Sequence, residues 1–259
     1  MLPREHHQPC GRQQARQRNE TGGAEYLACH QQSSVGTGAA HYAGPMPLTF
    51  AERAARADPQ GVLVLHHGRG SDEQDLIGLA DVLDPEQRLH IVAPRAPLRL
   101  RGSPGYHWYL VPRVGYPDPD SFRAAYQELA AFHDGLWERT GIGPEQTVLG
   151  GFSMGTVMSY ALGLGADRPP PAGILALSGF IPTVEGWQPS LAGRADTRVL
   201  IAHGRNDPVI PVTFARAALE LLQGAGFAVD YRESEAAHHV DPGDIPRVVA
   251  WLDATLGQD

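Results

Sequence analysis

Lysine is missing from this 259-residue chain, so its 21 basic side chains are all arginines. Without lysine there can be no Schiff-base lysine, no pyridoxal-phosphate anchor and no Walker-type phosphate lysine. Cysteine is almost missing too, because only Cys10 and Cys29 occur and both lie near the N-terminus. The body of the chain therefore has no cysteine nucleophile, no disulfide and no cysteine-based zinc site.

Long apolar runs are also lacking. No segment approaches the roughly 20 residues that a membrane-spanning helix needs, and the N-terminus has no apolar signal core. We therefore expect a cytoplasmic protein without a transmembrane segment. The formal net charge of −8 argues against a nucleic-acid partner, because phosphate binding needs a basic face. The oligomeric state is not readable from the sequence.

Composition divides the chain into two parts. Residues 1–45 are rich in Gln, His, Arg, Gly and Ser and have no helical or strand periodicity. Such a segment buries too little apolar area to offset its ordering entropy, so we expect a disordered N-terminal extension. One hypothesis is that Met46 is the native start. Residues 46–259 are expected to form one domain, since the length suits one large α/β domain and not two.

Apolar runs alternate with amphipathic stretches from residue 46 onward. Strands are expected at 61–66, 89–93, 146–150, 173–178, 197–202 and 227–232. Helices are expected from a capping-box pattern at 71–74 to about 83, and at about 118–140, 154–164, 211–224 and 244–256. Continuous apolar strands separated by helices predict an α/β fold with a mostly parallel sheet covered on both faces. Ligands bind beyond the carboxyl ends of the strands in such sheets.

One of these strand ends carries a candidate nucleophile. The segment 151–155 is Gly-Phe-Ser-Met-Gly, a G-x-S-x-G pattern between an expected strand and an expected helix. The small residues allow a sharp turn that lifts the hydroxyl of Ser153 to the top of the sheet, at a helix N-terminus. The alternative is an ordinary glycine-rich turn in which Ser153 only caps the helix.

A serine hydroxyl needs a base to take its proton and an acid to orient that base. In α/β hydrolases the order along the chain is Ser, then Asp or Glu, then His. Asp207 follows the strand at 197–202, although an aspartate before a proline is also a common turn residue. His238 and His239 follow the last strand, and one of them is the expected base. Asp241 is a rival acid, but it lies very close to the histidines in sequence.

The adjacent histidines also raise the question of a metal. Besides His238 and His239, a second pair occurs at His66 and His67. Two adjacent histidines rarely bind one metal together, and no carboxylate or cysteine spacing completes a ligand set. We therefore expect no metal and no cofactor, and we expect His67 and His203 to fix loops at strand ends.

Several ordered motifs give the chain from about 61 to 257 a specific resemblance to a known family. They are Leu65-His-His-Gly-Arg-Gly70, Ala93-Pro-Arg-Ala-Pro97, Trp108, Gly150-Gly-Phe-Ser-Met-Gly155, His203-Gly-Arg-Asn-Asp-Pro-Val-Ile-Pro211 and Ala237-His238. The chain resembles the phospholipase/carboxylesterase family of α/β hydrolases, which includes acyl-protein thioesterases. This resemblance implies an α/β-hydrolase fold, and it favours His238 over His239 as the base. The spacings between the expected strands are too short to hold a large cap domain.

The family resemblance also implies an oxyanion hole. Its two donors would be the backbone N–H groups of Arg69 and Met154. Relatives often have an apolar residue where this chain has Arg69, so the departure questions a plain long-chain acyl substrate. The loop at 95–116 carries Leu98, Leu100, Tyr106, Trp108, Tyr109 and Leu110, which wall an acyl pocket or form core beneath the loop. Trp108 is the expected substrate contact.

The sequence thus predicts a serine carboxylesterase with the triad Ser153, Asp207 and His238. It would hydrolyse a small-molecule ester or thioester through an acyl-enzyme intermediate, without a cofactor. An acyl thioesterase or lysophospholipase on the same triad is the first alternative. Two others are a non-catalytic binding protein of the same fold and a metal-assisted hydrolase that uses the histidine pairs. Acyl length and leaving group are set by pocket shape.

Overall fold

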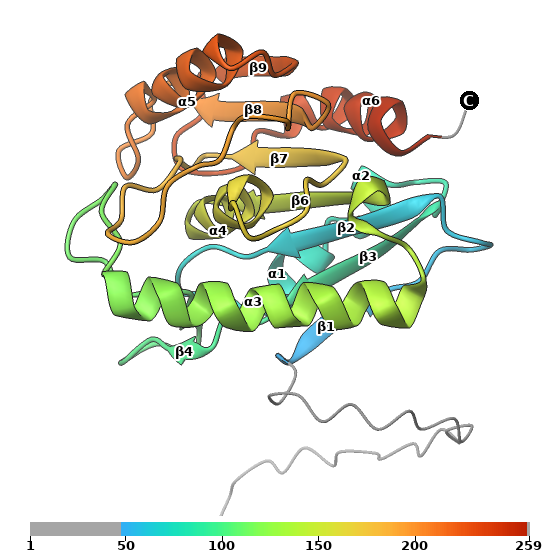
Figure 1. Ribbon diagram of the computed structural model, residues 1–259, viewed down its shortest axis with the longest axis horizontal. Coiled ribbons are helices and arrows are strands. Elements are labelled where there is room, and N and C mark those ends of the chain that lie inside the picture. Colours follow the sequence, from blue (N-terminus) through green and yellow to red (C-terminus); the bar gives the residue numbers. More distant parts are fainter. Residues whose placement is uncertain (1–47, 258–259) are drawn as a thin grey trace, which may run out of the picture. The chain divides into compact units, whose positions relative to one another are not determined.

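The computed structural model describes residues 48–257, so the extension expected over residues 1–45 lies outside the described part (Figure 1). The described chain contains a seven-stranded sheet in the order β1-β3-β2-β6-β7-β8-β9. The strands are β1 (Phe50–Arg53), β2 (Gly61–His66), β3 (Leu89–Pro94), β6 (Thr147–Phe152), β7 (Gly173–Leu177), β8 (Arg198–Gly204) and β9 (Val229–Ser234). Within it β1 pairs antiparallel with β3, and the other pairs are parallel. The predicted mostly parallel sheet is confirmed.

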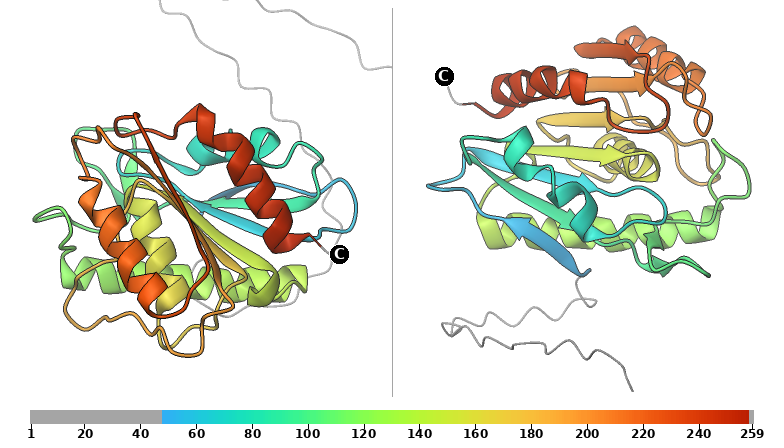
Figure 2. Two further views of the ribbon diagram at one scale, coloured as in Figure 1. Left: turned by 90° about the horizontal axis from the view of Figure 1, so that it is seen from above. Right: turned by 180° about the vertical axis from the view of Figure 1, so that it is seen from behind.

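Six α-helices accompany the sheet in the described residues. They are α1 (Glu73–Ile77), α2 (Ala80–Leu83), α3 (Pro119–Thr140), α4 (Met154–Leu164), α5 (Thr213–Gly224) and α6 (Ile245–Leu256), with short 3₁₀ turns at Pro144–Gln146 and Pro242–Asp244. Helices α3, α4 and α5 cover one face of the sheet, and α1, α2 and α6 cover the other (Figure 2). No helix within residues 48–257 is long and apolar enough to cross a membrane, and the expected cytoplasmic location stays a prediction.

The burial of alternate strand residues explains this layering. Val62 and Val64 of β2 pack with the cluster under α3 and α4, whereas Leu63 and Leu65 pack with α1, α2 and α6. Successive side chains of a strand point to opposite faces, so an uninterrupted apolar run serves two cores at once. All six residues of β2 are buried, as its sequence predicts.

Two local expectations were wrong. The single helix expected to follow the capping-box pattern is two short helices, because Gly78 ends α1. Asp72 caps α1 by accepting a hydrogen bond from the Gln74 N–H, so the box does not start at Ser71. The expected loop at 95–116 contains a small antiparallel hairpin, β4 (Leu98–Arg99) with β5 (Tyr106–His107). The edge strand β1 was missed, since three half-buried residues and one exposed residue leave little pattern.

Candidate active site

Ser153 lies on a strained turn between β6 and α4. Its backbone has φ 55° and ψ −118°, a conformation that side-chain-bearing residues rarely adopt. Nothing in the serine side chain favours this geometry, so the surrounding packing must hold it. The turn places the serine directly before the first residue of α4, where the unpaired N–H groups of the helix favour negative charge.

The two glycines of the motif are required by close backbone packing. A Cβ on Gly155 would lie 1.9 Å from the backbone oxygen of His66, and one on Gly151 would lie 2.5 Å from the Gly155 carbonyl carbon. Real Cβ atoms do not approach other atoms so closely. The sharp turn between β6 and α4 is therefore possible only with glycine at both positions, which explains the motif that the sequence displays.

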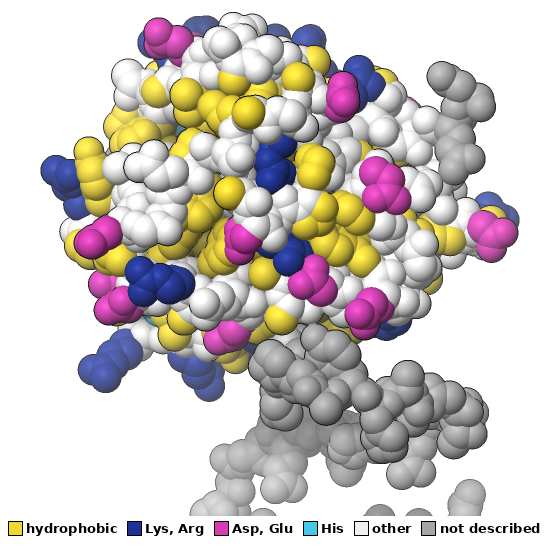
Figure 3. Space-filling model, in the orientation of Figure 1, with side chains coloured by type: hydrophobic (Ala, Val, Ile, Leu, Met, Phe, Trp, Pro, Cys, Tyr) yellow, Lys and Arg dark blue, Asp and Glu magenta, His cyan; other side chains and the backbone are white. Residues whose placement is uncertain are grey.

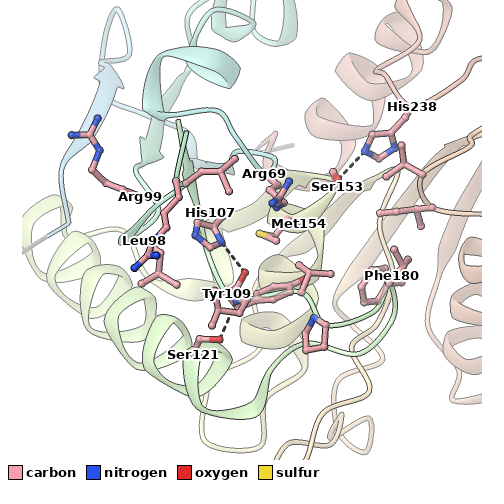
Figure 4. A pocket seen from close by; sticks show the side chains of 18 residues that line it. Arg69, Leu98, Arg99, His107, Tyr109, Ser121, Ser153, Met154, Phe180 and His238 are labelled. Atoms are coloured by element: carbon pink, nitrogen blue, oxygen red, sulfur yellow. Dashed lines mark hydrogen bonds between the residues drawn. The ribbon is translucent and has the colours of Figure 1, made fainter. Parts of the chain in front are cut away.

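His238 lies against Ser153 across the sheet edge (Figure 4). Its Nε2 is 2.9 Å from Ser153 Oγ, and its Nδ1 is 2.6 Å from Asp207 Oδ2. A carboxylate only accepts hydrogen bonds, so Nδ1 carries the proton and Nε2 is free to accept one from the serine hydroxyl. The ring of Phe152 packs on the imidazole with a centroid distance of 5.0 Å. The neighbouring His239 is exposed and does not reach the serine.

Asp207 lies in the loop after β8 and is held by several donors. Its Oδ1 accepts hydrogen bonds from the Val209 N–H at 2.8 Å and the Ile210 N–H at 2.9 Å. Burial of the carboxyl group opposes its ionisation, but the bonds from His238 and these N–H groups keep its pKa below the ordinary value. Asp207 is thus an ionised acceptor at neutral pH. The rival Asp241 accepts instead from the Gly243 N–H.

Two other histidines hold loops at strand ends, as expected. His203 Nε2 donates to the Ile210 carbonyl at 2.8 Å, which fixes the loop that carries Asp207. His67 donates from Nδ1 to the Gly68 carbonyl at 2.7 Å and accepts the Ala96 N–H at Nε2. This use of both ring nitrogens requires a neutral imidazole, and burial lowers the pKa of His67 accordingly.

The two expected oxyanion donors belong to segments that adjoin Ser153. Met154 follows the serine directly, and the loop that carries Arg69 passes beside it. A Cβ on Gly68 would lie 3.6 Å from the Ser153 Cβ, so this loop offers its backbone at close range. Within residues 48–257 neither the Arg69 nor the Met154 N–H donates a hydrogen bond to another protein group. Both are available to a ligand.

Trp108 is placed differently from the expectation. Its side chain is 0% exposed, and it does not line the cavity at Ser153. Instead, its Nε1 donates to the His67 carbonyl at 2.8 Å, and its ring packs against the His67 ring at 5.2 Å. The substrate contact predicted for Trp108 is therefore wrong. The tryptophan supports the loop of Arg69 from behind, because a large ring with one N–H donor suits a buried carbonyl.

A cavity of about 1100 Å³ opens beside Ser153 (Figure 4). Its walls are mainly apolar and come from the 98–114 loop, α4 and the loops after β7 and β8. The lining residues are Arg69, Leu98, Arg99, Leu100, Arg101, His107, Tyr109, Leu110, Val111, Pro112, Val114, Ser121, Ser153, Met154, Phe180, Val209, Ile210 and His238. Leu110 is 53% exposed and Val209 50% exposed, so the cavity opens to solvent without a cap. Four of the six loop residues named from the sequence line it.

The sequence did not single out several of these residues. Phe180 follows β7 and Ile210 follows β8, and both are buried apolar side chains with no pattern that separates them from core. Arg99 and Arg101 lie in the 95–116 segment, of which the sequence interpretation named only apolar and aromatic residues for the pocket wall. These two arginines, two positions apart in a segment that follows a strand end, were the available signal.

The histidine pairs do not converge on a common point. His66 contacts Ser159 Oγ and His133 Nε2 in the core, whereas His67 turns to Gly68 and Ala96. No group of three or more His, Cys, Asp or Glu side chains in the described residues is arranged to hold a metal ion. On the face seen in Figure 3, basic and acidic side chains are interspersed and neither forms a continuous patch.

Comparisons with known proteins show the family of the chain. The phospholipase/carboxylesterase family matches residues 51–256. Acyl-protein thioesterase 1 of Kluyveromyces lactis is 28% identical over 202 residues, which cover 72% of this chain and 87% of that protein. The enzyme of the same name from Gibberella zeae is 35% identical over 118 residues, a match that spans 44% of this chain and only 49% of that relative.

Solved structures share the fold. Esterase PE8 superposes with a TM-score of 0.67 at 29% identity, over 81% of this chain and 100% of that one. The Bacillus cereus carboxylesterase gives a TM-score of 0.71 at 22% identity, over 80% and 94% of the two chains. The architecture and the family match define a serine hydrolase of the α/β-hydrolase fold that acts on ester bonds. The chain belongs to the phospholipase/carboxylesterase family.

Proposed function

We propose that this protein hydrolyses carboxylic esters through an acyl-enzyme intermediate on Ser153. The observation that carries the proposal is the unbroken hydrogen-bonded series from Ser153 Oγ to His238 to Asp207. In this scheme His238 Nε2 takes the serine proton while Oγ attacks the acyl carbon. The same nitrogen then returns the proton to the leaving alcohol.

The second half of the reaction uses the same groups. His238 takes a proton from water, the resulting hydroxide attacks the acyl carbon, and Ser153 Oγ leaves and regains its proton as the acid departs. Asp207 keeps the imidazole in the required tautomer and stabilises the imidazolium. The free N–H groups of Arg69 and Met154 bind the oxyanion, and each such donor typically contributes about 3 kcal/mol at the transition state. No step calls for a cofactor.

Thioester hydrolysis is the second candidate, and the names of the relatives favour it. Both of the relatives described above are acyl-protein thioesterases. A thiolate leaves more readily than an alkoxide, so the same triad suffices for either bond. The shape of the cavity and not the triad would decide between them. We also propose residues 46–259 as the catalytic domain, since the family match covers 51–256.

The decisive experiment combines active-site labelling with turnover. The protein is treated with a fluorophosphonate probe, and hydrolysis of p-nitrophenyl hexanoate and of the equally uncharged thioester S-(p-nitrophenyl) thiohexanoate is measured for the wild type and Ser153→Ala. The proposal predicts labelling and turnover in the wild type and neither in the variant. The ratio of kcat/KM for the two substrates ranks ester against thioester.

Other outcomes would contradict the proposal in distinct ways. Labelling or turnover that survives Ser153→Ala would refute the serine mechanism. Loss of turnover with a chelator would point to metal-assisted hydrolysis. A folded protein that binds the hexanoyl esters but neither reacts with the probe nor turns them over would be a binding protein of this fold.

A further inference from the structure

The cavity at Ser153 has an unusual charge pattern. Three arginines line it, Arg69, Arg99 and Arg101, and no Asp or Glu of the described chain does. The whole chain has a net charge of −8, so the charged residues of the cavity have the opposite sign to the chain as a whole. Asp207, the nearest carboxylate of the site, lies behind His238 and outside the lining.

These arginines also differ from most others in their partners. Most of the remaining arginines in residues 48–257 pair with a carboxylate, as Arg95 does with Glu73 and Arg216 with Glu233. None of the three cavity arginines lies within 4 Å of a carboxylate oxygen in that range. All three are exposed, and the Arg99 guanidinium carbon lies 5.4 Å from the centroid of the Tyr106 ring. With no carboxylate partner among the described residues, their five-donor guanidinium groups keep capacity to bind an anion.

The hairpin β4–β5, which carries Arg99, is hydrogen-bonded to the loop after β2, which carries Arg69. Arg99 is in β4, and Arg101 is in the turn before β5. The hairpin bonds to the loop after β2 in two places: the Gly70 N–H donates to the Tyr106 carbonyl at 2.7 Å, and the Tyr106 N–H donates to the Ser71 carbonyl at 2.8 Å. A Cβ on Gly105 would lie 1.9 Å from Gly70 O, so the two segments touch. The backbone that carries Arg99 and Arg101 is therefore fixed relative to the loop that carries the Arg69 N–H.

Most of the other lining residues are apolar, with His107 and Ser121 as polar members besides the catalytic residues. Leu98, Leu100 and Tyr109 line the cavity together with the Met154 side chain. A substrate that fits has an apolar stretch next to its scissile bond and an anionic group beyond it. Guanidinium groups bind carboxylate and phosphate with paired, charge-assisted hydrogen bonds.

We propose that the enzyme is selective for esters or thioesters that carry an anionic group, a carboxylate or phosphate, bound by Arg99 and Arg101. The inference rests on the proposed function, because it names the substrate class of the same site. Arg69 adds positive charge at the reacting end, where its backbone N–H is already committed to the oxyanion.

The test uses pairs of esters matched in length. On the acyl side, mono-p-nitrophenyl adipate is compared with p-nitrophenyl hexanoate, which has the same six-carbon chain without the charge. On the alcohol side, 1-hexanoylglycerol 3-phosphate is compared with 1-hexanoylglycerol. Each kcat/KM ratio is measured for the wild type, for Arg99→Gln/Arg101→Gln, and for Arg56→Gln/Arg123→Gln. The last variant removes the same charge from exposed arginines outside the cavity.

The expected result is a preference of about tenfold or more for the charged member of one pair, as charge-assisted hydrogen bonds provide. The preference should be lost in Arg99→Gln/Arg101→Gln, kept in the control variant, and weakened in the wild type by 0.5 M salt. The pair that responds tells whether the anion sits on the acyl or the alcohol side.

Two results would overturn the inference while leaving the proposed function standing. One is turnover of the neutral esters at rates equal to or above those of the charged ones, which would make Arg99 and Arg101 merely solvated. The other is a charge preference that survives Arg99→Gln/Arg101→Gln. Absence of turnover for all four esters would instead refute the proposed function itself, and the inference with it.

Discussion

Replacing Asp207 by asparagine tests the proposed role of the carboxylate with almost no change in shape. In the native site Oδ1 accepts the N–H groups of Val209 and Ile210 at 2.8 and 2.9 Å, while Oδ2 faces His238 Nδ1 at 2.6 Å. The amide of an asparagine has one oxygen and one NH₂ group, so it cannot serve both sides as an acceptor.

The two backbone donors decide which way the amide turns. Directing the NH₂ group at the backbone would leave the part-buried Val209 N–H and the buried Ile210 N–H without acceptors, at about 1–3 kcal/mol for the buried one. The amide oxygen therefore stays with the backbone and the NH₂ group faces His238. The imidazole must then accept at Nδ1 and carry its proton on Nε2, where it can no longer take the proton of Ser153.

The expected loss in kcat for Asp207→Asn is about 10⁴-fold, the size found when a triad imidazole is held in the wrong tautomer. The KM should change little, because the side chain does not line the cavity. The assay is p-nitrophenyl hexanoate hydrolysis, with circular dichroism as the check on folding. Asp241→Asn is the matched control, since Asp241 bonds only outside the site, and it should keep near-native rates. A folded Asp207→Asn within tenfold of wild type would refute the reasoning.

Three further predictions concern histidines and the buried tryptophan. His238→Ala should abolish ester turnover and His239→Ala should not, and the reverse in steady-state assays would overturn the choice of base. Trp108→Phe removes the donor to the buried His67 carbonyl, so kcat and thermal stability should fall while KM and the preference for acyl length stay constant. A changed preference for acyl length would show that Trp108 contacts the substrate after all. Burial lowers the pKa of His133 to about 3, so between pH 6.5 and 3 only the unfolded chain binds this proton and stability falls as pH falls. In urea titrations His133→Phe should reduce that pH dependence by about one proton, and an unchanged slope would contradict the assignment.

Strand and helix positions were predictable because their signals are local. The apolar runs at 61–66 and 173–177 and the amphipathic segment at 154–164 each report the burial of their own residues, and they lie where the pattern placed them. The edge strand β1 and the hairpin β4–β5 were not, because each is held by pairing with a distant segment and has too few residues to show a period.

The position of Ser153 was also determined by the sequence, since the glycines at 151 and 155 are dictated by contacts within one turn and its nearest strand. The enzyme class and family followed from the same motif and its companions, and the family match confirms them. A strained turn needs specific residues at fixed spacing, so a short sequence motif is enough to identify it.

The residues alone left open which histidine meets the serine; the family resemblance favoured His238, and the tertiary structure places it there. His238 and Ser153 are 85 residues apart, and whether His238 or its neighbour points at the hydroxyl depends on the path of the loop after β9. Trp108 turned from an expected substrate contact into a buried support because a backbone carbonyl lay within reach of its indole. The arginines gathered at the cavity are likewise brought together by the hairpin β4–β5, and no local pattern encodes a side chain's direction across such distances.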